Sequence, residues 1–367
     1  MNEMKIEELA RKEVSKLSLY EVDRGADLEH PKRFLNLNLN ENLTISDDAV
    51  GKLLLEACQG VDLRVYPPIY GSMATEAISE FFGTRETEVF VGNGADGVLD
   101  SLMKVFVEKG SKVVVIEPTF SMYDYFIKLY GGKKVTALLT PDFNLDVDRV
   151  LKKCDEEPSL IFICSPNNPT GNQFERGDIA TILQEFEGIV VVDEAYADFA
   201  GYTVMDWTRE FNNLAVIRTF SKASGLAGIR SGFLISNESI VDYVKRATPP
   251  FAVNVVTQRL ITLALENWSY FQQKINYIVE ERKWLRNTLN SIDGVISYPS
   301  DANFLLLRIT HRGLSSSTVK KRLKNRGVLV KDRSGLPLLE NCIRVTVGTH
   351  KMNQTLTSAL KEVLEEE

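Results

Sequence analysis

One lysine stands among small and apolar residues in the segment TFSKASGLAGIRSG (219–232). Lys222 follows two hydroxyl side chains, Thr219 and Ser221, and Arg230 comes eight positions after it. An amine in a partly apolar pocket has a depressed pKa, so it can condense with an aldehyde and later act as a general base. A lone lysine is more often a solvated surface residue, so other residues must decide between the two interpretations.

Three further polar side chains stand where apolar, β-branched runs end. Asn168 comes shortly after the run LIFIC, and Asp193 and Tyr196 follow the run IVVV. Lys222 in turn follows the run LAVIR. In parallel α/β sheets, ligands bind beyond the carboxyl ends of the strands. Each residue alone also fits a turn, a helix cap or the surface, but together they predict one shared site at a sheet edge.

The residue types in this set match the needs of one cofactor. A carboxylate such as Asp193, facing a pyridine nitrogen, keeps that ring protonated and therefore electron-withdrawing. A phenol and an amide, here Tyr196 and Asn168, can reach a ring hydroxyl. Together with a reactive amine, these groups perform the tasks that pyridoxal 5′-phosphate requires of a protein.

A glycine-rich turn, GNGADG (92–97), follows the run EVFV and opens a predicted helix. The first N–H groups of such a helix can bind an anion, and Arg230 can add a forked cation. The turn also fits the dinucleotide fingerprint, with Glu117 about 20 residues further on, as in a nicotinamide-dependent dehydrogenase. That alternative leaves Lys222 unexplained and places the Asp96 carboxylate against a pyrophosphate.

The elements that must position these residues are visible as an alternation of patterns. Apolar runs alternate with helical patterns from about residue 86, which predicts a mainly parallel sheet covered on both faces, a three-layer α/β large domain. The runs are EVFVG, KVVVIEP, KVTALLT, LIFICSP, IVVVDEAY, LAVIRTF and SGFLIS. Later, long helical patterns surround NFLLLRI and CIRVTVG, which predicts a smaller α+β domain. We expect the large domain at 45–250 and the small domain to combine 1–44 with 251–367.

The bulk composition is that of a globular protein that handles small molecules. Hydrophobic residues make up 44% and charged residues 25%, which argues against disorder. The net charge of -7 argues against a nucleic-acid partner. Four widely spaced cysteines without a C-x-x-C pair indicate neither a metal site nor a disulfide framework. The N-terminus is charged and amphipathic and no apolar run is long enough to span a bilayer, so we expect a cytoplasmic protein without a membrane partner.

Over nearly its whole length the chain resembles the fold-type I aminotransferases, most closely the histidinol-phosphate aminotransferase group. The resemblance rests on LNLNEN, VYPPIYGSM, GNGADGVLDSL, EPTFSMY, CSPNNPTG, VVDEAYADF, RTFSKASGLAGIRSGF and CIRVTVGT, in the family's order. No single motif decides the matter, but eight motifs in order are specific.

The resemblance implies roles for the residues at matching positions. Lys222 would bear pyridoxal phosphate and move a proton between the substrate α-carbon and C4′ of the cofactor. Asp193 would pair with the pyridinium nitrogen, Tyr196 and Asn168 would reach the ring hydroxyl, and Phe120 would stack on the ring. The residues that would hold the phosphate are Ala95, Asp96, Thr219, Ser221 and Arg230.

The resemblance also implies a homodimer with shared active sites, because Tyr66 matches a tyrosine that reaches the phosphate from the neighbouring subunit. Arg344 matches the arginine for the substrate carboxylate, here that of glutamate or 2-oxoglutarate. Tyr20 matches a substrate-contacting tyrosine, with a surface aromatic as the alternative. Lys331 stands where many members carry an arginine for the substrate phosphate, and a lysine loses the bidentate fork. Arg333 would compensate or lie in a solvated loop.

We therefore expect an aminotransferase that moves an amino group between L-histidinol phosphate and 2-oxoglutarate or glutamate, in histidine biosynthesis. The runner-up is an enzyme of the same fold that acts on aromatic or other amino acids. A lyase or decarboxylase on this scaffold is more distant, since some related decarboxylases carry phenylalanine at the position of Tyr196. A non-enzymatic sensor that keeps the cofactor-binding core would need a DNA-binding segment, and no basic helix-turn-helix candidate is visible.

Overall fold

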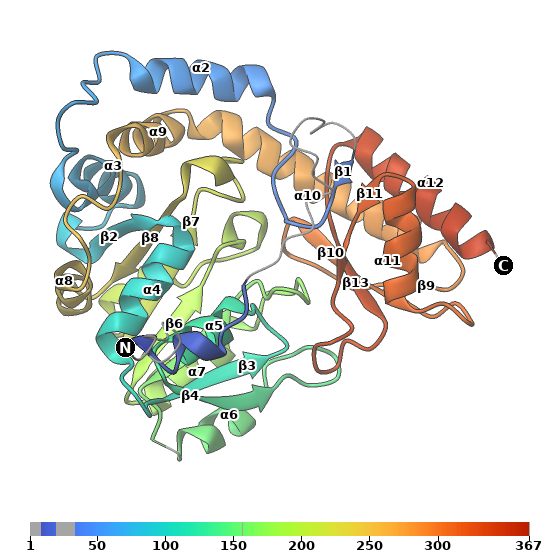
Figure 1. The fold of residues 1–367 in the computed structure, drawn as a ribbon, viewed down its shortest axis with the longest axis horizontal. Coiled ribbons are helices and arrows are strands. Elements are labelled where there is room, and N and C mark those ends of the chain that lie inside the picture. Colours follow the sequence, from blue (N-terminus) through green and yellow to red (C-terminus); the bar gives the residue numbers. More distant parts are fainter. Residues whose placement is uncertain (1–8, 20–33, 156, 367) are drawn as a thin grey trace, which may run out of the picture.

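The computed structural model describes residues 9–19, 34–155 and 157–366. These residues contain three sheets, one of seven strands, one of four and one of two. Figure 1 shows the large sheet with its helices on the left and the smaller sheet with α11 and α12 on the right. Most of the predicted site residues lie in the large sheet and in the loops and helices that follow its strands.

The large sheet is mainly parallel, as predicted. In spatial order its strands are β2 (Val89–Asn93), β8 (Ser231–Ser236), β7 (Leu214–Thr219), β6 (Ile189–Asp193), β5 (Leu160–Cys164), β3 (Lys112–Glu117) and β4 (Lys133–Leu138). Only β8 runs antiparallel to its neighbours, β2 and β7. All seven apolar runs identified in the sequence therefore form strands, and the direction of β8 is the feature that its run did not reveal.

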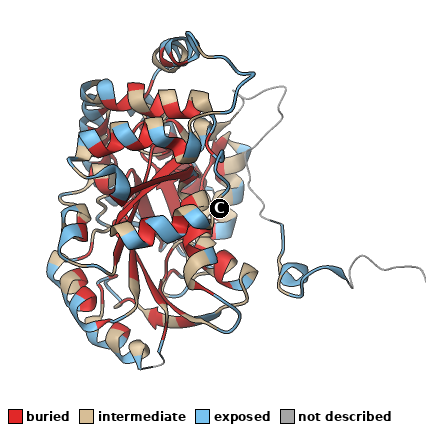
Figure 2. Cartoon of the chain, turned by 90° about the vertical axis from the view of Figure 1, so that its left-hand side faces the viewer, coloured by how far each residue is buried: buried red, intermediate tan, exposed pale blue. Residues whose placement is uncertain are grey.

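Helices cover both faces of this sheet because its side chains alternate between the faces. On β3, Val113 and Val115 pack with α4, α5 and α8, whereas Val114 and Ile116 pack with α6 and α7. The helices of this part are α2 (Asp47–Cys58), α3 (Ser72–Phe82), α4 (Gly94–Phe106), α5 (Met122–Leu129), α6 (Val147–Cys154), α7 (Arg176–Glu185), α8 (Glu238–Arg246) and α9 (Val255–Glu266). Figure 2 shows the buried strands between helices that are buried on their inner faces and exposed on their outer faces.

The smaller sheet is antiparallel and belongs to an α+β unit. Its strands in order are β12 (Lys331–Asp332), β13 (Cys342–Thr346), β10 (Phe304–Ile309) and β9 (Val295–Ser297). It packs on α10 (Trp268–Asn290), α11 (Ser316–Asn325) and α12 (His350–Glu365), and β1 (Leu35–Asn36) pairs in parallel with β11 (Val328–Leu329). Leu37 contributes to the same core, so the N-terminal segment contacts the C-terminal part of the chain.

Two helices in succession, α9 and α10, form the first of the long helical patterns in the C-terminal part of the chain. Asn267 separates α9 from α10, and its side-chain amide donates a hydrogen bond to the carbonyl of Leu263 at 2.8 Å. Helix α9 packs with α2 and α3, whereas α10 packs with the smaller sheet.

The division of the chain into two domains at residue 250 stays a prediction. Among the described residues, no helix is both long and apolar enough to cross a membrane.

Gly232 allows a close approach that positions the start of α4. A β-carbon at Gly232 would lie 2.4 Å from the backbone nitrogen of Ala95, so Gly232→Ala must push β8 and α4 apart. Overpacking of this kind costs about 1–3 kcal/mol, and we expect a lower melting temperature in differential scanning calorimetry. The control is Gly177→Ala, because nothing lies within 4 Å of an added β-carbon there. Equal melting of both variants would contradict the close approach.

Candidate active site

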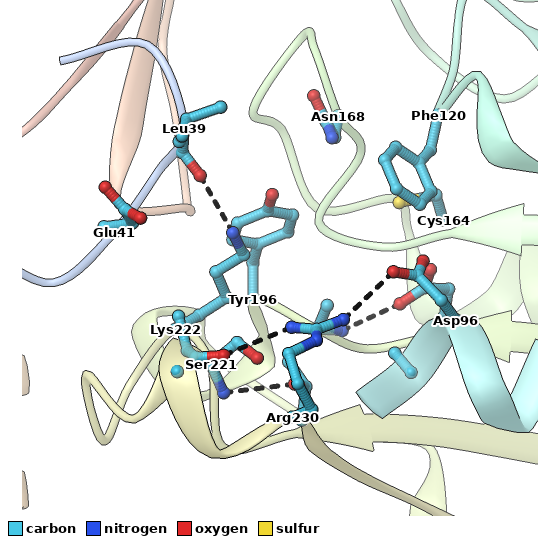
Figure 3. Close-up of a pocket in the computed structure, with 16 residues that line it drawn as sticks. Leu39, Glu41, Asp96, Phe120, Cys164, Asn168, Tyr196, Ser221, Lys222 and Arg230 are labelled. Atoms are coloured by element: carbon cyan, nitrogen blue, oxygen red, sulfur yellow. Dashed lines mark hydrogen bonds and ion pairs between the residues drawn. The ribbon is translucent and has the colours of Figure 1, made fainter. Parts of the chain in front are cut away.

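A cavity of about 570 Å³ opens at the carboxyl ends of β5, β6 and β7 and at the start of α4. Figure 3 shows side chains from these separate elements pointing into it. The structure brings ten of the predicted site residues together in its lining: Ala95, Asp96, Phe120, Asn168, Asp193, Tyr196, Thr219, Ser221, Lys222 and Arg230. The parallel sheet edge therefore gathers residues that are up to 135 positions apart in the chain.

Lys222 lies in the turn after β7 and extends into the cavity (Figure 3). Its Nζ donates a hydrogen bond to the carbonyl of Leu39 at 3.0 Å and lies 5.8 Å from the ring centroid of Tyr196. Burial, with the nearby charge of Arg344, lowers the pKa of Lys222 to about 8. A much larger fraction of this amine is neutral near pH 7 than in a solvated lysine, so it can act as a nucleophile and as a base.

Asp193 ends β6 at the floor of the cavity, with only 4% of its surface exposed. One carboxylate oxygen accepts a hydrogen bond from the Tyr123 hydroxyl at 2.7 Å, and the other accepts from the backbone N–H of Ala195 at 3.0 Å. Both of these donors are uncharged. Burial raises the pKa of Asp193, and the Tyr123 hydroxyl opposes that rise. The carboxylate therefore suits a cationic N–H donor in the cavity.

Tyr196 and Asn168 both line the cavity, and each side chain has a polar partner. The Tyr196 hydroxyl accepts a hydrogen bond from Nδ2 of Asn40 at 3.0 Å, and burial raises the pKa of Tyr196 to about 12. Oδ1 of Asn168 accepts from Nη1 of Arg344 at 2.5 Å. Both side chains are buried, so the phenol and the amide have fixed positions at the cavity.

Arg230 lies above the first turn of α4, where its Nη2 pairs with Oδ2 of Asp96 at 3.2 Å. The backbone of Arg230 is left-handed, with φ of 51°. A β-carbon at Gly94 would lie 2.7 Å from Arg230 Nη2, so glycine leaves the space that the guanidinium occupies. A cation, a helix N-terminus and the Ser221 hydroxyl thus line one end of the cavity, as an anion site requires.

Arg344 does not line the cavity directly but is buried beside it. Its Nη2 donates to the carbonyl of Asn38 at 2.7 Å, while Nη1 reaches Asn168. On β13, Ile343 and Val345 pack into the core of the small unit, so the alternate residue Arg344 faces the large sheet. Lys331 is the partner of Arg344 across the β12–β13 pair, and directly opposite residues project from the same face of a sheet.

The structure does not bring Tyr66 into the cavity of its own chain. Tyr66 is 79% exposed and its ring stacks on Phe251, with 4.6 Å between the centroids, so it does not line the cavity of its own chain. Tyr20 lies outside the described residues.

The structure adds residues to which the sequence assigned no role. Tyr123 contacts Asp193, Asn40 contacts Tyr196, and the Leu39 carbonyl contacts Lys222. Glu41 and Cys164 also line the cavity. All of these residues stand in the motifs EPTFSMY, LNLNEN and CSPNNPTG. Membership of a motif was therefore the signal that could have identified them. The partner of each side chain depends on the tertiary fold.

Comparison with solved structures places the fold among known enzymes. The histidinol-phosphate aminotransferase from Sinorhizobium meliloti, solved in complex with pyridoxal-5′-phosphate, matches with a TM-score of 0.86 and 23% sequence identity, covering 96% of both chains. At this level of identity the match concerns the fold.

Comparison with sequences is more specific. A histidinol-phosphate aminotransferase of Thermoanaerobacter sp. is 38% identical over 360 residues, which cover 98% of this chain and 99% of the relative. Another, of Thermococcus gammatolerans, is 39% identical over 329 residues, covering 90% and 92%. The family model described as aminotransferase class I and II matches residues 32–360. This protein therefore belongs to the class I and II aminotransferase family.

Proposed function

We propose that this protein is a pyridoxal-phosphate-dependent aminotransferase that moves an amino group between L-histidinol phosphate and 2-oxoglutarate or glutamate. One observation carries the proposal: the neutralisable amine of Lys222 shares a cavity with Asp193, Asn168 and Tyr196, in a chain of this family. The substrate is supported by two relatives that are named histidinol-phosphate aminotransferases and that align with 98% and 90% of this chain.

The residues present fit the proposed cofactor. The buried carboxylate of Asp193 has two uncharged donors, so a protonated pyridine nitrogen would supply the missing cation. The start of α4 and Arg230 would hold the phosphate, together with the hydroxyls of Thr219 and Ser221. Phe120 is half-buried and lines the cavity, where its side chain would stack on the pyridine ring of the cofactor. Tyr196 and Asn168 would bind the ring hydroxyl.

The chemistry follows from the groups that the chain supplies. When bound, pyridoxal phosphate supplies an electron sink next to the α-carbon of the amino donor. Lys222 Nζ, with a pKa of about 8, would then be the base that takes the α-proton and delivers it to C4′. Asp193 would hold a proton on the ring nitrogen, and Tyr196 and Asn168 would fix the orientation of the ring. Arg344 would bind the carboxylate of glutamate or 2-oxoglutarate.

We further propose that Lys331 contacts the phosphate of the substrate. It lies opposite Arg344 in the sheet, so both side chains project from the face that Arg344 turns toward the large sheet. A lysine supplies a point charge rather than a fork. Arg333, two residues on, is a second candidate for this contact.

The subunit arrangement and location are also proposals. We infer a homodimer in which Tyr66 of one subunit reaches the cofactor phosphate of the other. This is supported by the exposure of Tyr66 and of the nearby apolar side chains Leu63, Val65 and Ile69, an exposed cluster that a partner would cover. We place the enzyme in the cytoplasm, where its four free cysteines remain reduced, and expect no nucleic-acid or membrane partner.

The substrate proposal predicts a selective effect of Lys331→Gln. Loss of a hydrogen bond to a charged group costs about 1.5–3 kcal/mol, so kcat/KM for L-histidinol phosphate should fall roughly 10- to 100-fold. The value for L-histidinol, which lacks the phosphate, should change little. The control is Lys321→Gln on the exposed side of α11. Equal losses for both substrates would contradict the phosphate contact, and wild-type activity no higher with L-histidinol phosphate than with L-phenylalanine would contradict the substrate.

The shared-site proposal predicts complementation between two inactive variants. Lys222→Ala and Tyr66→Ala each damage every site in their own homodimers. After equal mixing and subunit exchange, half of the dimers are mixed and each mixed dimer has one intact site, so activity should recover to about a quarter of wild type. Parallel mixing of each variant with itself gives the baseline. No recovery, despite mixed dimers seen by native mass spectrometry, would place Tyr66 in the site of its own subunit, and full activity of Tyr66→Ala alone would place it outside both sites.

A further inference from the structure

Tyr123 is a buried residue that the mechanism above does not use. Its side chain lies on α5, has no exposed surface, and donates its hydroxyl hydrogen to Oδ2 of Asp193 at 2.7 Å. The second oxygen of Asp193 is held by the backbone N–H of Ala195 at 3.0 Å. The carboxylate thus has one donor from its own loop and one from a separate helix.

The packing around Tyr123 fixes the direction of this hydrogen bond. Its ring stacks on Phe162 of β5 with 4.5 Å between centroids and 1° between planes, and its other neighbour, Phe120, meets it edge-on at 5.7 Å. A side chain held by two aromatic contacts has few alternative rotamers. The hydroxyl can therefore act as a fixed anchor for the carboxylate.

The segment that carries Tyr123 is also tied to the loop that carries Asn168. Nδ2 of Asn167 donates to the carbonyl of Pro118 at 2.8 Å, and the Thr119 hydroxyl donates to Oδ1 of Asn167 at 2.9 Å. Residues 118–123 thus link Phe120 at the cavity wall, Asp193 at its floor and the loop after β5. Movement of this segment would displace all three.

We propose that Tyr123 is a positioning residue that keeps the Asp193 carboxylate ionised and directed at the ring nitrogen of the bound cofactor. This inference rests on the proposed function, because it assumes that Asp193 faces that nitrogen. A hydrogen-bond partner on the side of a binding group that faces away from the ligand commonly fixes the orientation and the basicity of that group. Here the partner is the uncharged hydroxyl of Tyr123, which stabilises the carboxylate. Because it carries no charge, it does not compete with the protonated ring nitrogen for the carboxylate.

The electrostatics around the pair favour this direction of donation. Burial raises the pKa of Asp193, and the hydrogen bond from Tyr123 is the first influence that lowers it again. Burial and the adjacent carboxylate raise the pKa of Tyr123 well above its ordinary value, so the phenol remains a donor at physiological pH. Asp96, Glu194 and Cys164 are the other titratable groups that act on this pair, and all three favour protonated forms.

The test measures the protonation of the ring nitrogen directly. Holoenzyme is prepared with ¹⁵N-labelled pyridoxal phosphate, and the ¹⁵N chemical shift is followed between pH 6 and pH 10 for wild type, Tyr123→Phe, Asp193→Asn and the control Tyr125→Phe on the same helix. Losing a hydrogen bond to a charged group shifts an equilibrium by roughly 10- to 100-fold. In Tyr123→Phe we expect the ring proton to shift toward Asp193 by that factor, so the ¹⁵N chemical shift between pH 6 and pH 8 moves toward the value of an unprotonated ring, with Tyr125→Phe unchanged.

The variants separate failure of the inference from failure of the proposed function. If Asp193→Asn titrates like wild type, Asp193 does not face the nitrogen and the role assigned to it is wrong. If Asp193→Asn loses the proton but Tyr123→Phe matches Tyr125→Phe, only the role of Tyr123 is wrong. Should Tyr123→Phe fail to fold, Phe162→Leu keeps the hydroxyl but removes its stacking partner. A ¹⁵N chemical shift that moves toward the unprotonated value in that variant supports the inference, and an unchanged shift overturns it.

Discussion

The parallel pairing of β5, β6 and β7 is the constraint on which the site depends. The register places Cys164 beside Asp193, and Asp193 beside Ile217 on the other side, so the three strands end within two residues of one another. Loops that leave parallel strands at the same edge must share one volume. Asn168, Asp193 and Lys222 therefore meet at the cavity although they are far apart in the sequence.

Buried charges hold the loop that carries Tyr196 from two directions. Arg218 of β7 pairs with Glu194 at 2.9 Å and with Asp198, and all three side chains are largely buried. Arg282 of α10 donates to the carbonyl of Phe199 at 3.2 Å and to that of Ala302 at 2.8 Å. Removing one partner of such a buried pair leaves an uncompensated charge. This loop thus joins the large sheet to the helix that supports the small one.

The part of the site that could be predicted is the part set by strand ends and residue type. Lys222, Asp193 and Asn168 each follow an apolar run, and a parallel sheet brings such positions together whatever the details of packing. The contacts of Tyr123 and Asn40 could not be predicted in this way, because their partners are 70 and 156 residues away. The antiparallel direction of β8 could not be predicted because an apolar run has no direction. The boundary between α9 and α10 at Asn267 could not be predicted because one polar residue does not end a helical pattern.

The central claim is that Lys222 carries the cofactor, and one mapping experiment tests it most directly. The holoenzyme is reduced with borohydride, digested with trypsin and analysed by mass spectrometry. We predict that the label blocks cleavage after Lys222 and appears on the uncleaved peptide TFSKASGLAGIR (219–230), and that Lys222→Ala protein carries no label there. A label on another lysine, or ordinary cleavage after Lys222 in protein that retains its bound cofactor, would contradict the account.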